Sequence, residues 1–197
     1  TAAYLLPILN QISQTNKSYT QALVLAPTRE LAQQIDQQVE GLAYFTGISS
    51  IAVYGGGDGI IYEQQRRAMK EGVDIIIATP GRLIAHLNSG IVKLQQLKHL
   101  VLDEADRMLD MGFIHDIKKI INLIPKRRQN LMFSATFSND IKKLADDFLT
   151  NPTLIEVARS NATAENVTQK VYLVEQASKQ ALLSQLLLTE GNQQVII

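Results

Sequence analysis

Three acidic residues, Asp103, Glu104 and Asp106, stand directly after the apolar run HLVL. In an open α/β sheet, ligands bind outside the carboxyl ends of the strands, so a strand at HLVL would deliver these acids to a binding edge. Two adjacent carboxylates suit a magnesium ion on nucleotide phosphates, one holding the hydrated metal and the other orienting the attacking water. Taken alone, the acids could instead complement a helix N-terminus.

Two other apolar runs end in residues typical of a phosphate site. These residues are Thr28 and Arg29 after ALVLAP, and Pro80, Gly81 and Arg82 after DIIIAT. Helix N–H groups together with a guanidinium bind phosphate, and such contacts hold a nucleic-acid backbone without reading its bases. Each group alone would be an ordinary threonine cap beside a solvated arginine. Together they outline a track for a backbone.

Two further predicted strand ends carry small or hydroxyl side chains. The run YGGGDG at 54–59 could let a backbone approach closely, or it could be a flexible turn. Ser134 and Thr136 in MFSAT place two hydroxyls at the same edge as the acids. There they could bond Asp106 or Glu104, or they could cap the helix that follows.

Short apolar runs alternate with segments of helical period, which predicts an α/β fold with a parallel sheet flanked by helices. The predicted strands lie in ALVLAP, SIAVYGG, DIIIATP, 97–104, 128–136 and 153–157. Residues 159–166 are polar and aperiodic, so we expect a linker there. Residues 167–175 and QQVII are predicted strands, and 179–191 is a predicted helix closed by a glycine. The expected domains are therefore 1–158 and a truncated second unit, 167–197.

Composition narrows the possibilities less than the motifs do. The 19 basic and 19 acidic residues cancel, so the overall charge gives no sign of a nucleic-acid partner. The absence of cysteine removes disulfides and thiolate metal sites, and His86, His99 and His115 lack metal-ligand spacing. No segment reads as a membrane span or a signal peptide, and we expect a cytoplasmic protein.

Four motifs in order, PTREL at 27–31, TPGR at 79–82, DEAD at 103–106 and SAT at 134–136, each follow a predicted strand. With them the chain resembles the DEAD-box ATP-dependent RNA helicases of bacterial type. The resemblance implies two RecA-like domains, with ATP in the cleft between them and single-stranded RNA crossing both. It implies an enzyme that uses ATP to unwind or remodel short RNA duplexes and RNA–protein complexes.

The resemblance also assigns roles to individual residues. Asp103 would hold hydrated Mg²⁺, Glu104 would orient the hydrolytic water, and Asp106 with Ser134 and Thr136 would couple nucleotide state to RNA binding. The RNA-backbone contacts would be Pro27, Thr28, Arg29, Gly55, Gly56, Gln65, Thr79, Pro80, Gly81 and Arg82. The stretch from the glycine pair to Gln65 is longer than the family pattern.

Thr1 resembles the last residue of the family's phosphate-binding loop, and would then contact ATP and Mg²⁺. The glycines and lysine of that loop, the adenine-recognising glutamine motif and the arginines of the second domain are not in this sequence. We therefore expect the 197-residue chain by itself not to turn over ATP. Two alternatives remain: a helicase directed to DNA, and a nucleotide-independent RNA-binding clamp or scaffold.

Overall fold

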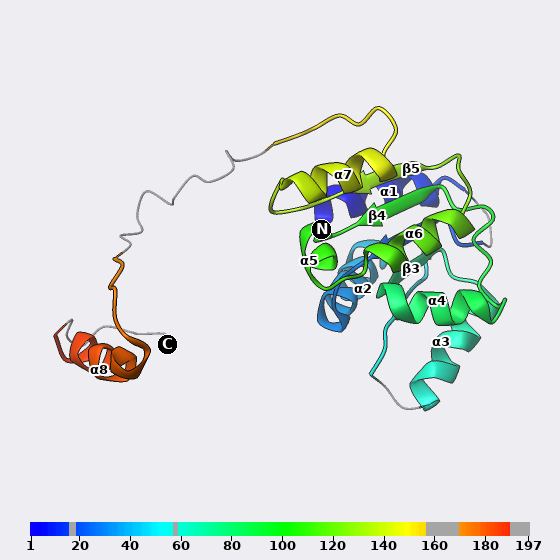
Figure 1. The fold of residues 1–197 in the computed structure, drawn as a ribbon. Coiled ribbons are helices and arrows are strands. Elements are labelled where there is room, and N and C mark those ends of the chain that lie inside the picture. The colour runs from blue at the N-terminus through cyan, green and yellow to red at the C-terminus, as the bar shows by residue number, and fades with distance from the viewer. Residues whose placement is uncertain (16–18, 57–58, 157–169, 190–197) are drawn as a thin grey trace. The chain divides into compact units, whose positions relative to one another are not determined.

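The computed structural model describes residues 1–15, 19–56, 59–156 and 170–189. The chain divides into two compact units, Thr1–Ile155 and Glu156–Ile197, which are described separately (Figure 1). The candidate site lies wholly in the first unit.

The first unit is built on a five-stranded sheet in the order β2-β3-β1-β4-β5. All neighbouring strands are parallel, as predicted. Every residue of the three central strands, β3, β1 and β4, is buried, because helices cover both faces of the sheet. The strands are β1 (Ala22–Leu25), β2 (Ser50–Val53), β3 (Ile75–Ala78), β4 (His99–Leu102) and β5 (Gln129–Met132).

In the described part of the first unit, seven helices flank this sheet in two layers (Figure 1). On one face, α1 (Ala2–Ser13) and α2 (Arg29–Ala43) pack their apolar side chains against alternate strand residues. The other face packs against α3 (Gly59–Glu71), α4 (Pro80–Asn88), α5 (Ala105–Asp110), α6 (Ile114–Leu123) and α7 (Asn139–Phe148). Strand side chains alternate between these two cores because successive residues point to opposite faces.

Two strand predictions are wrong within the described residues. Residues 153–156 form no strand, and Leu154 and Ile155 are exposed. Residues 170–175 also form no strand, and Leu173 is fully exposed. Both segments have the apolar and β-branched residues of strands, but propensity alone does not form a strand without a neighbour to pair with.

The second unit contains a short 3-10 helix, Gln176–Ser178, followed by α8 (Lys179–Thr189). The predicted helix at 179–191 is thus present over its described part. The predicted linker 159–166, the closing Gly191 and the predicted strand QQVII lie outside the described residues. None of the helices that the structure describes has both the length and the apolar character needed to cross a bilayer.

Candidate functional site

Asp103 follows β4, where its backbone N–H donates to the Leu25 carbonyl of β1 at 3.0 Å. Its carboxylate is fixed on both oxygens: the Tyr4 hydroxyl donates to Oδ2 at 2.8 Å and the Glu104 N–H donates to Oδ1 at 3.1 Å. Burial, and then the charge of Asp103, raise the pKa of Tyr4 well above its ordinary value. The phenol therefore stays protonated and remains a donor to this carboxylate.

Glu104 has φ 51° and ψ 54°, a left-handed backbone conformation that is uncommon outside glycine. Such a conformation costs on the order of 1–3 kcal/mol and persists only where the surroundings enforce it. Here the next N–H, that of Ala105, donates to the Phe133 carbonyl at 2.9 Å. The Glu104 side chain does not cap α5, and its partner is Arg107 at 3.3 Å on the surface. A pair this exposed is weak, so the carboxylate is available to other partners.

Asp106 joins the DEAD segment to the SAT segment. Its Oδ2 accepts from the N–H groups of Ala135 and Thr136, both at 3.1 Å, and from Thr136 Oγ1 at 3.2 Å. Ser134 does not bond an acid but donates to the Thr136 carbonyl at 2.7 Å. The predicted contact between Thr136 and Asp106 is therefore present. The predicted contact of Ser134 with the acids is replaced by a bond within its own turn.

The possibility that Ser134 or Thr136 caps the next helix is not borne out, because Ser138 is the cap of α7. Its side chain accepts from the Ile141 N–H at 3.3 Å. The two hydroxyls are thus left to the turn and to Asp106.

Thr1 is the N-cap of α1, and its carbonyl accepts from the N–H groups of Tyr4 and Leu5. Its side chain makes no cap bond but interacts with the Tyr4 phenol, which also donates to Asp103. A hydroxyl and a carboxylate thus meet at one phenol, and both are oxygen ligands of the type that Mg²⁺ takes. Within the described residues no group of three or more His, Cys, Asp or Glu side chains could hold a metal. A magnesium ion here would fit only with phosphate and water as its remaining ligands, which is its usual habit.

Two neighbouring strands, β1 and β3, lead directly into helix starts at the same edge. Thr28 caps α2 by accepting from the Leu31 N–H at 3.2 Å. Thr79 is the N-cap residue of α4 without a side-chain cap bond, so its hydroxyl is not used by the helix. Pro27 and Pro80 are buried, whereas Gly81 faces open space.

The arginines of these two helix starts each lie over a tyrosine ring. The Arg29 Cζ atom is 4.9 Å from the centroid of Tyr54, and the Arg82 Cζ atom is 5.3 Å from that of Tyr62. A Cβ atom added to Gly55 would lie 3.9 Å from both Nε and Nη2 of Arg82, so this guanidinium lies beside the glycine turn. These contacts hold two cationic groups at neighbouring strand ends.

Gly56 follows in the same turn with φ +85°, the left-handed region that glycine adopts without strain. The turn after β2 therefore needs a glycine at this position.

Gln65 does not lie on the surface as an RNA contact would. It is only 4% exposed, and its amide donates to the carbonyls of Ala52 at 3.5 Å and Tyr54 at 3.3 Å. Ala52 lies in β2 and Tyr54 follows the strand, so Gln65 supports the backbone that leads to the glycine turn. The prediction that Gln65 contacts RNA therefore does not fit its position in this structure.

Three tyrosines contribute contacts that the motifs did not reveal. Tyr4 orients Asp103, while Tyr54 and Tyr62 carry the two arginines. Tyr54 lies within the predicted strand run SIAVYGG, and Tyr62 precedes Gln65 by three residues, but neither position indicates a contact with an arginine. The role of Tyr4 depends on contact across 99 residues of sequence and has no local signal.

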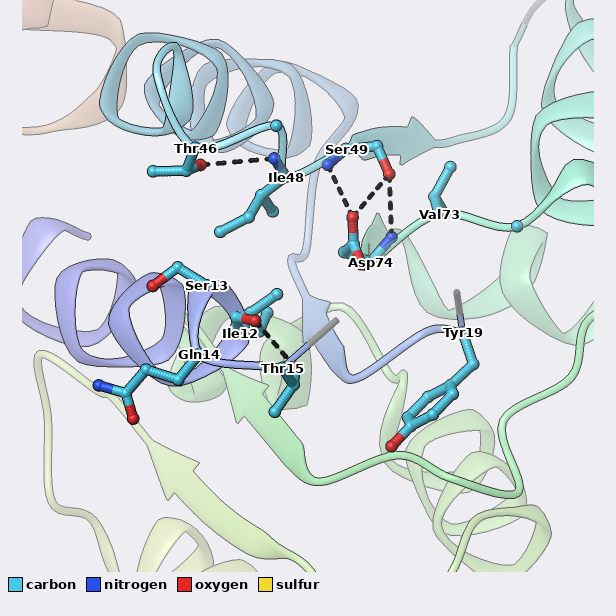
Figure 2. A pocket seen from close by; sticks show the side chains of 12 residues that line it. Ile12, Ser13, Gln14, Thr15, Tyr19, Thr46, Ile48, Ser49, Val73 and Asp74 are labelled. Atoms are coloured by element: carbon cyan, nitrogen blue, oxygen red, sulfur yellow. Dashed lines mark hydrogen bonds between the residues drawn. The ribbon is translucent and has the colours of Figure 1, made fainter. Parts of the chain in front are cut away.

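A separate pocket of about 460 Å³ opens at the amino ends of the strands (Figure 2). There Asp74 Oδ2 accepts from both the N–H and the hydroxyl of Ser49 at 2.9 Å. None of the predicted site residues lines this pocket. It is therefore distinct from the edge that carries the motifs.

The comparisons with known proteins agree with this geometry. A sequence model of the family "DEAD/DEAH box helicase" matches residues 1–144. The DEAD-box ATP-dependent RNA helicase CshA of Geobacillus kaustophilus (strain HTA426) is 40% identical over 187 residues, which make up 95% of this chain and 39% of that protein. The crystal structure of the yeast DEAD-box splicing factor Prp28 matches with a TM-score of 0.69 at 33% identity, over 75% of this chain and 37% of that one.

The first unit thus has the RecA-like fold of this class of helicases, a parallel sheet with acids and phosphate-type helix starts along one edge. The chain belongs to the DEAD/DEAH box helicase family. It spans 39% of the length of the curated relative that it matches.

Proposed function

We propose that the full-length protein is an ATP-dependent RNA helicase that unwinds or remodels short RNA duplexes and RNA–protein complexes. The observation that carries this proposal is the bonding of Asp106 to Ala135 and Thr136. It ties the acid-bearing turn to a second strand end, so a change at the nucleotide can alter the edge that faces RNA. Family membership and the named activity of the bacterial relative support the same function.

In the hydrolytic step, a water attacks the γ-phosphorus of ATP and the bond from that phosphorus to the β,γ-bridging oxygen breaks, giving ADP and inorganic phosphate. The carboxylate of Glu104 orients this water and accepts its proton. Asp103, held by Tyr4, and Thr1 are the residues that would hold Mg²⁺. When bound, Mg²⁺ neutralises the charge on the phosphate oxygens.

RNA would cross the ends of β2, β3 and β1. Arg29 and Arg82 supply charge for phosphates, and the turn at Gly55 and Gly56 allows close approach of a backbone. The Thr79 hydroxyl, which makes no cap bond to α4, lies on the same edge and would donate to RNA. Such contacts do not read sequence, so we expect little base preference from this unit. We also retain the cytoplasm as the proposed location.

The experiment is ATP hydrolysis by the full-length protein with single-stranded RNA, single-stranded DNA or neither. We expect RNA alone to stimulate turnover, and Glu104→Gln to abolish turnover while ATP still binds. Glu40→Gln, an exposed glutamate on α2 away from this edge, is the matched control. Equal stimulation by DNA would favour a DNA-directed motor. RNA binding that ignores nucleotide, with no hydrolysis, would favour the clamp.

A further inference from the structure

Arg82, Tyr62 and His86 form a stack between α3 and α4. The rings of Tyr62 and His86 are parallel to within 11° with centroids 4.4 Å apart, and the Arg82 guanidinium lies over the same tyrosine at 5.3 Å. His86 is completely buried, whereas Tyr62 is half-buried. A flexible arginine is thereby held against a ring that is itself fixed from within the protein.

The hydrogen bonds around Gln65 fix the protonation of His86. The amide nitrogen of Gln65 donates to the carbonyls of Ala52 and Tyr54, so its oxygen, 3.4 Å from His86 Nε2, must be the acceptor. His86 therefore carries its proton on Nε2, and its Nδ1 is a buried atom without a partner in the described part of the chain. A second proton would place an unsatisfied donor in the interior.

The charges around His86 act in the same direction. Burial, and then the positive charge of Arg82, lower the pKa of His86, and the opposing effect of Glu63 is smaller. The imidazole therefore stays neutral and does not repel the Arg82 guanidinium.

Gln65 connects this stack to the glycine turn. One of its two carbonyl acceptors belongs to Tyr54, the residue directly before Gly55 and the one whose ring carries Arg29. The guanidinium of Arg82 in turn lies beside Gly55. Movement of the stack would therefore shift both the arginine and the turn.

We propose that Tyr62, Gln65 and His86 are positioning residues that hold Arg82 and the turn at 54–56 in one geometry for binding an RNA sugar-phosphate backbone. The proposal rests on the proposed function and assigns these three residues no contact with RNA. They act by keeping a long cationic side chain and a glycine turn from sampling other conformations before RNA arrives. Gln65 thus affects RNA binding from inside the fold.

The test measures binding of a fluorescein-labelled single-stranded oligouridylate to the full-length protein by anisotropy, with a non-hydrolysable ATP analogue present. Tyr62→Leu removes the stacking face, and we expect it to weaken RNA binding roughly threefold to tenfold. Tyr62→Phe keeps the face and should retain the affinity of the wild type. Tyr44→Leu, a change at a tyrosine that is 78% exposed, is the control and should have no effect.

A double-mutant cycle separates positioning from a general loss of structure. In the Arg82→Ala background, Tyr62→Leu should weaken RNA binding by a smaller factor than in the wild type, because only the turn at 54–56 is left for it to position. The turnover number for ATP at saturating RNA should be unchanged in Tyr62→Leu. Full additivity of the two substitutions, or a fall in turnover at saturating RNA, would overturn the proposal.

Gln65→Glu provides a second variant, because a carboxylate keeps the acceptor for His86 but cannot donate to the carbonyls of Ala52 and Tyr54. It should weaken RNA binding while circular dichroism shows a folded protein. Wild-type affinity in Gln65→Glu would remove Gln65 from the proposal. If the wild type binds RNA and Arg82→Ala weakens it, yet Tyr62→Leu does not, the positioning inference fails alone. If the wild type itself does not bind RNA, the proposed function fails.

Discussion

The hydrogen bond from the Tyr4 hydroxyl to Asp103 can be removed by a single substitution whose effect on stability can be calculated. Tyr4 is 2% exposed and donates to Asp103 at 2.8 Å, while its ring packs against Phe133 with centroids 5.1 Å apart. Tyr4→Phe removes only the hydroxyl and keeps the ring contact, so no large cavity forms. A hydrogen bond to a charged group contributes about 1.5–3 kcal/mol, and its loss also leaves one carboxylate oxygen without its partner.

We therefore expect Tyr4→Phe to lower the free energy of unfolding by about 2 kcal/mol, or Tm by roughly 4–8 °C for a chain of this size. Thermal and urea unfolding followed by circular dichroism measure this change. The matched control is Tyr44→Phe, whose ring is 78% exposed and should shift neither value. In full-length protein, Tyr4→Phe should also raise the KM for ATP with Mg²⁺, since Asp103 loses the group that orients it.

A double-mutant cycle with Asp103→Ala tests whether Tyr4 stabilises the protein through Asp103. Once the carboxylate is absent, Tyr4→Phe should have a much smaller effect on stability, because the hydroxyl has lost its charged acceptor. A loss below about 0.5 kcal/mol in the single variant, or the same loss in both backgrounds, would contradict the assignment of Tyr4 as the anchor of Asp103.

Three further predictions follow from the same geometry. Asp106→Asn should lower the free energy of unfolding by about 1 kcal/mol and reduce the ratio of ATP turnover with RNA to that without RNA. The Oδ1 atom of Asp106 accepts from the Arg107 N–H, and its Oδ2 atom accepts from the N–H groups of Ala135 and Thr136. An amide can accept on one side only, so the substitution breaks one of these sets of bonds. The exposed control Asp110→Asn should leave the turnover ratio unchanged. The same unchanged ratio in Asp106→Asn would contradict the coupling role of Asp106. Burial lowers the pKa of His86 and His99 below their ordinary 6.5. As the pH falls, the unfolded chain therefore takes up protons before the folded chain does. The free energy of unfolding should be constant above about pH 7 and should fall as the pH drops through 6.5. Urea unfolding between about pH 7 and pH 6 measures this change in stability, and His115→Gln is the control. A stability that rises on acidification would contradict the prediction. Arg82→Ala should reduce the slope of log affinity for single-stranded RNA against log salt by about 0.7, and an unchanged slope would place the guanidinium off the phosphates.

The strand-end motifs could be predicted from sequence because each is local. Every apolar run that became a strand of the sheet is followed within a few residues by its polar group, and the parallel sheet brings those ends to one edge. The contact of Asp106 with Thr136 followed from this reasoning, since β4 and β5 are neighbours. The predicted roles of these residues remain predictions until they are measured.

The parts that sequence did not reveal depend on packing between distant segments. Tyr4 reaches Asp103 only because α1 covers the sheet beside β4, and nothing in the sequence around Tyr4 indicates this. The family resemblance assigns Gln65 to RNA, yet Gln65 is buried and donates to the carbonyls of Ala52 and Tyr54, which need donors. The predicted strand at 153–157 failed over its described residues for the opposite reason, since apolar content without a pairing partner does not form a sheet.

We propose that the acids at the end of β4 support ATP hydrolysis that responds to RNA. The most direct measurement is the rate of phosphate release by the full-length protein and its Glu104→Gln variant, at saturating ATP and Mg²⁺, with and without single-stranded RNA. We expect RNA to increase the wild-type rate and Glu104→Gln to lose turnover while retaining ATP binding. Wild-type turnover in Glu104→Gln, or a wild-type rate that RNA does not change, would contradict it.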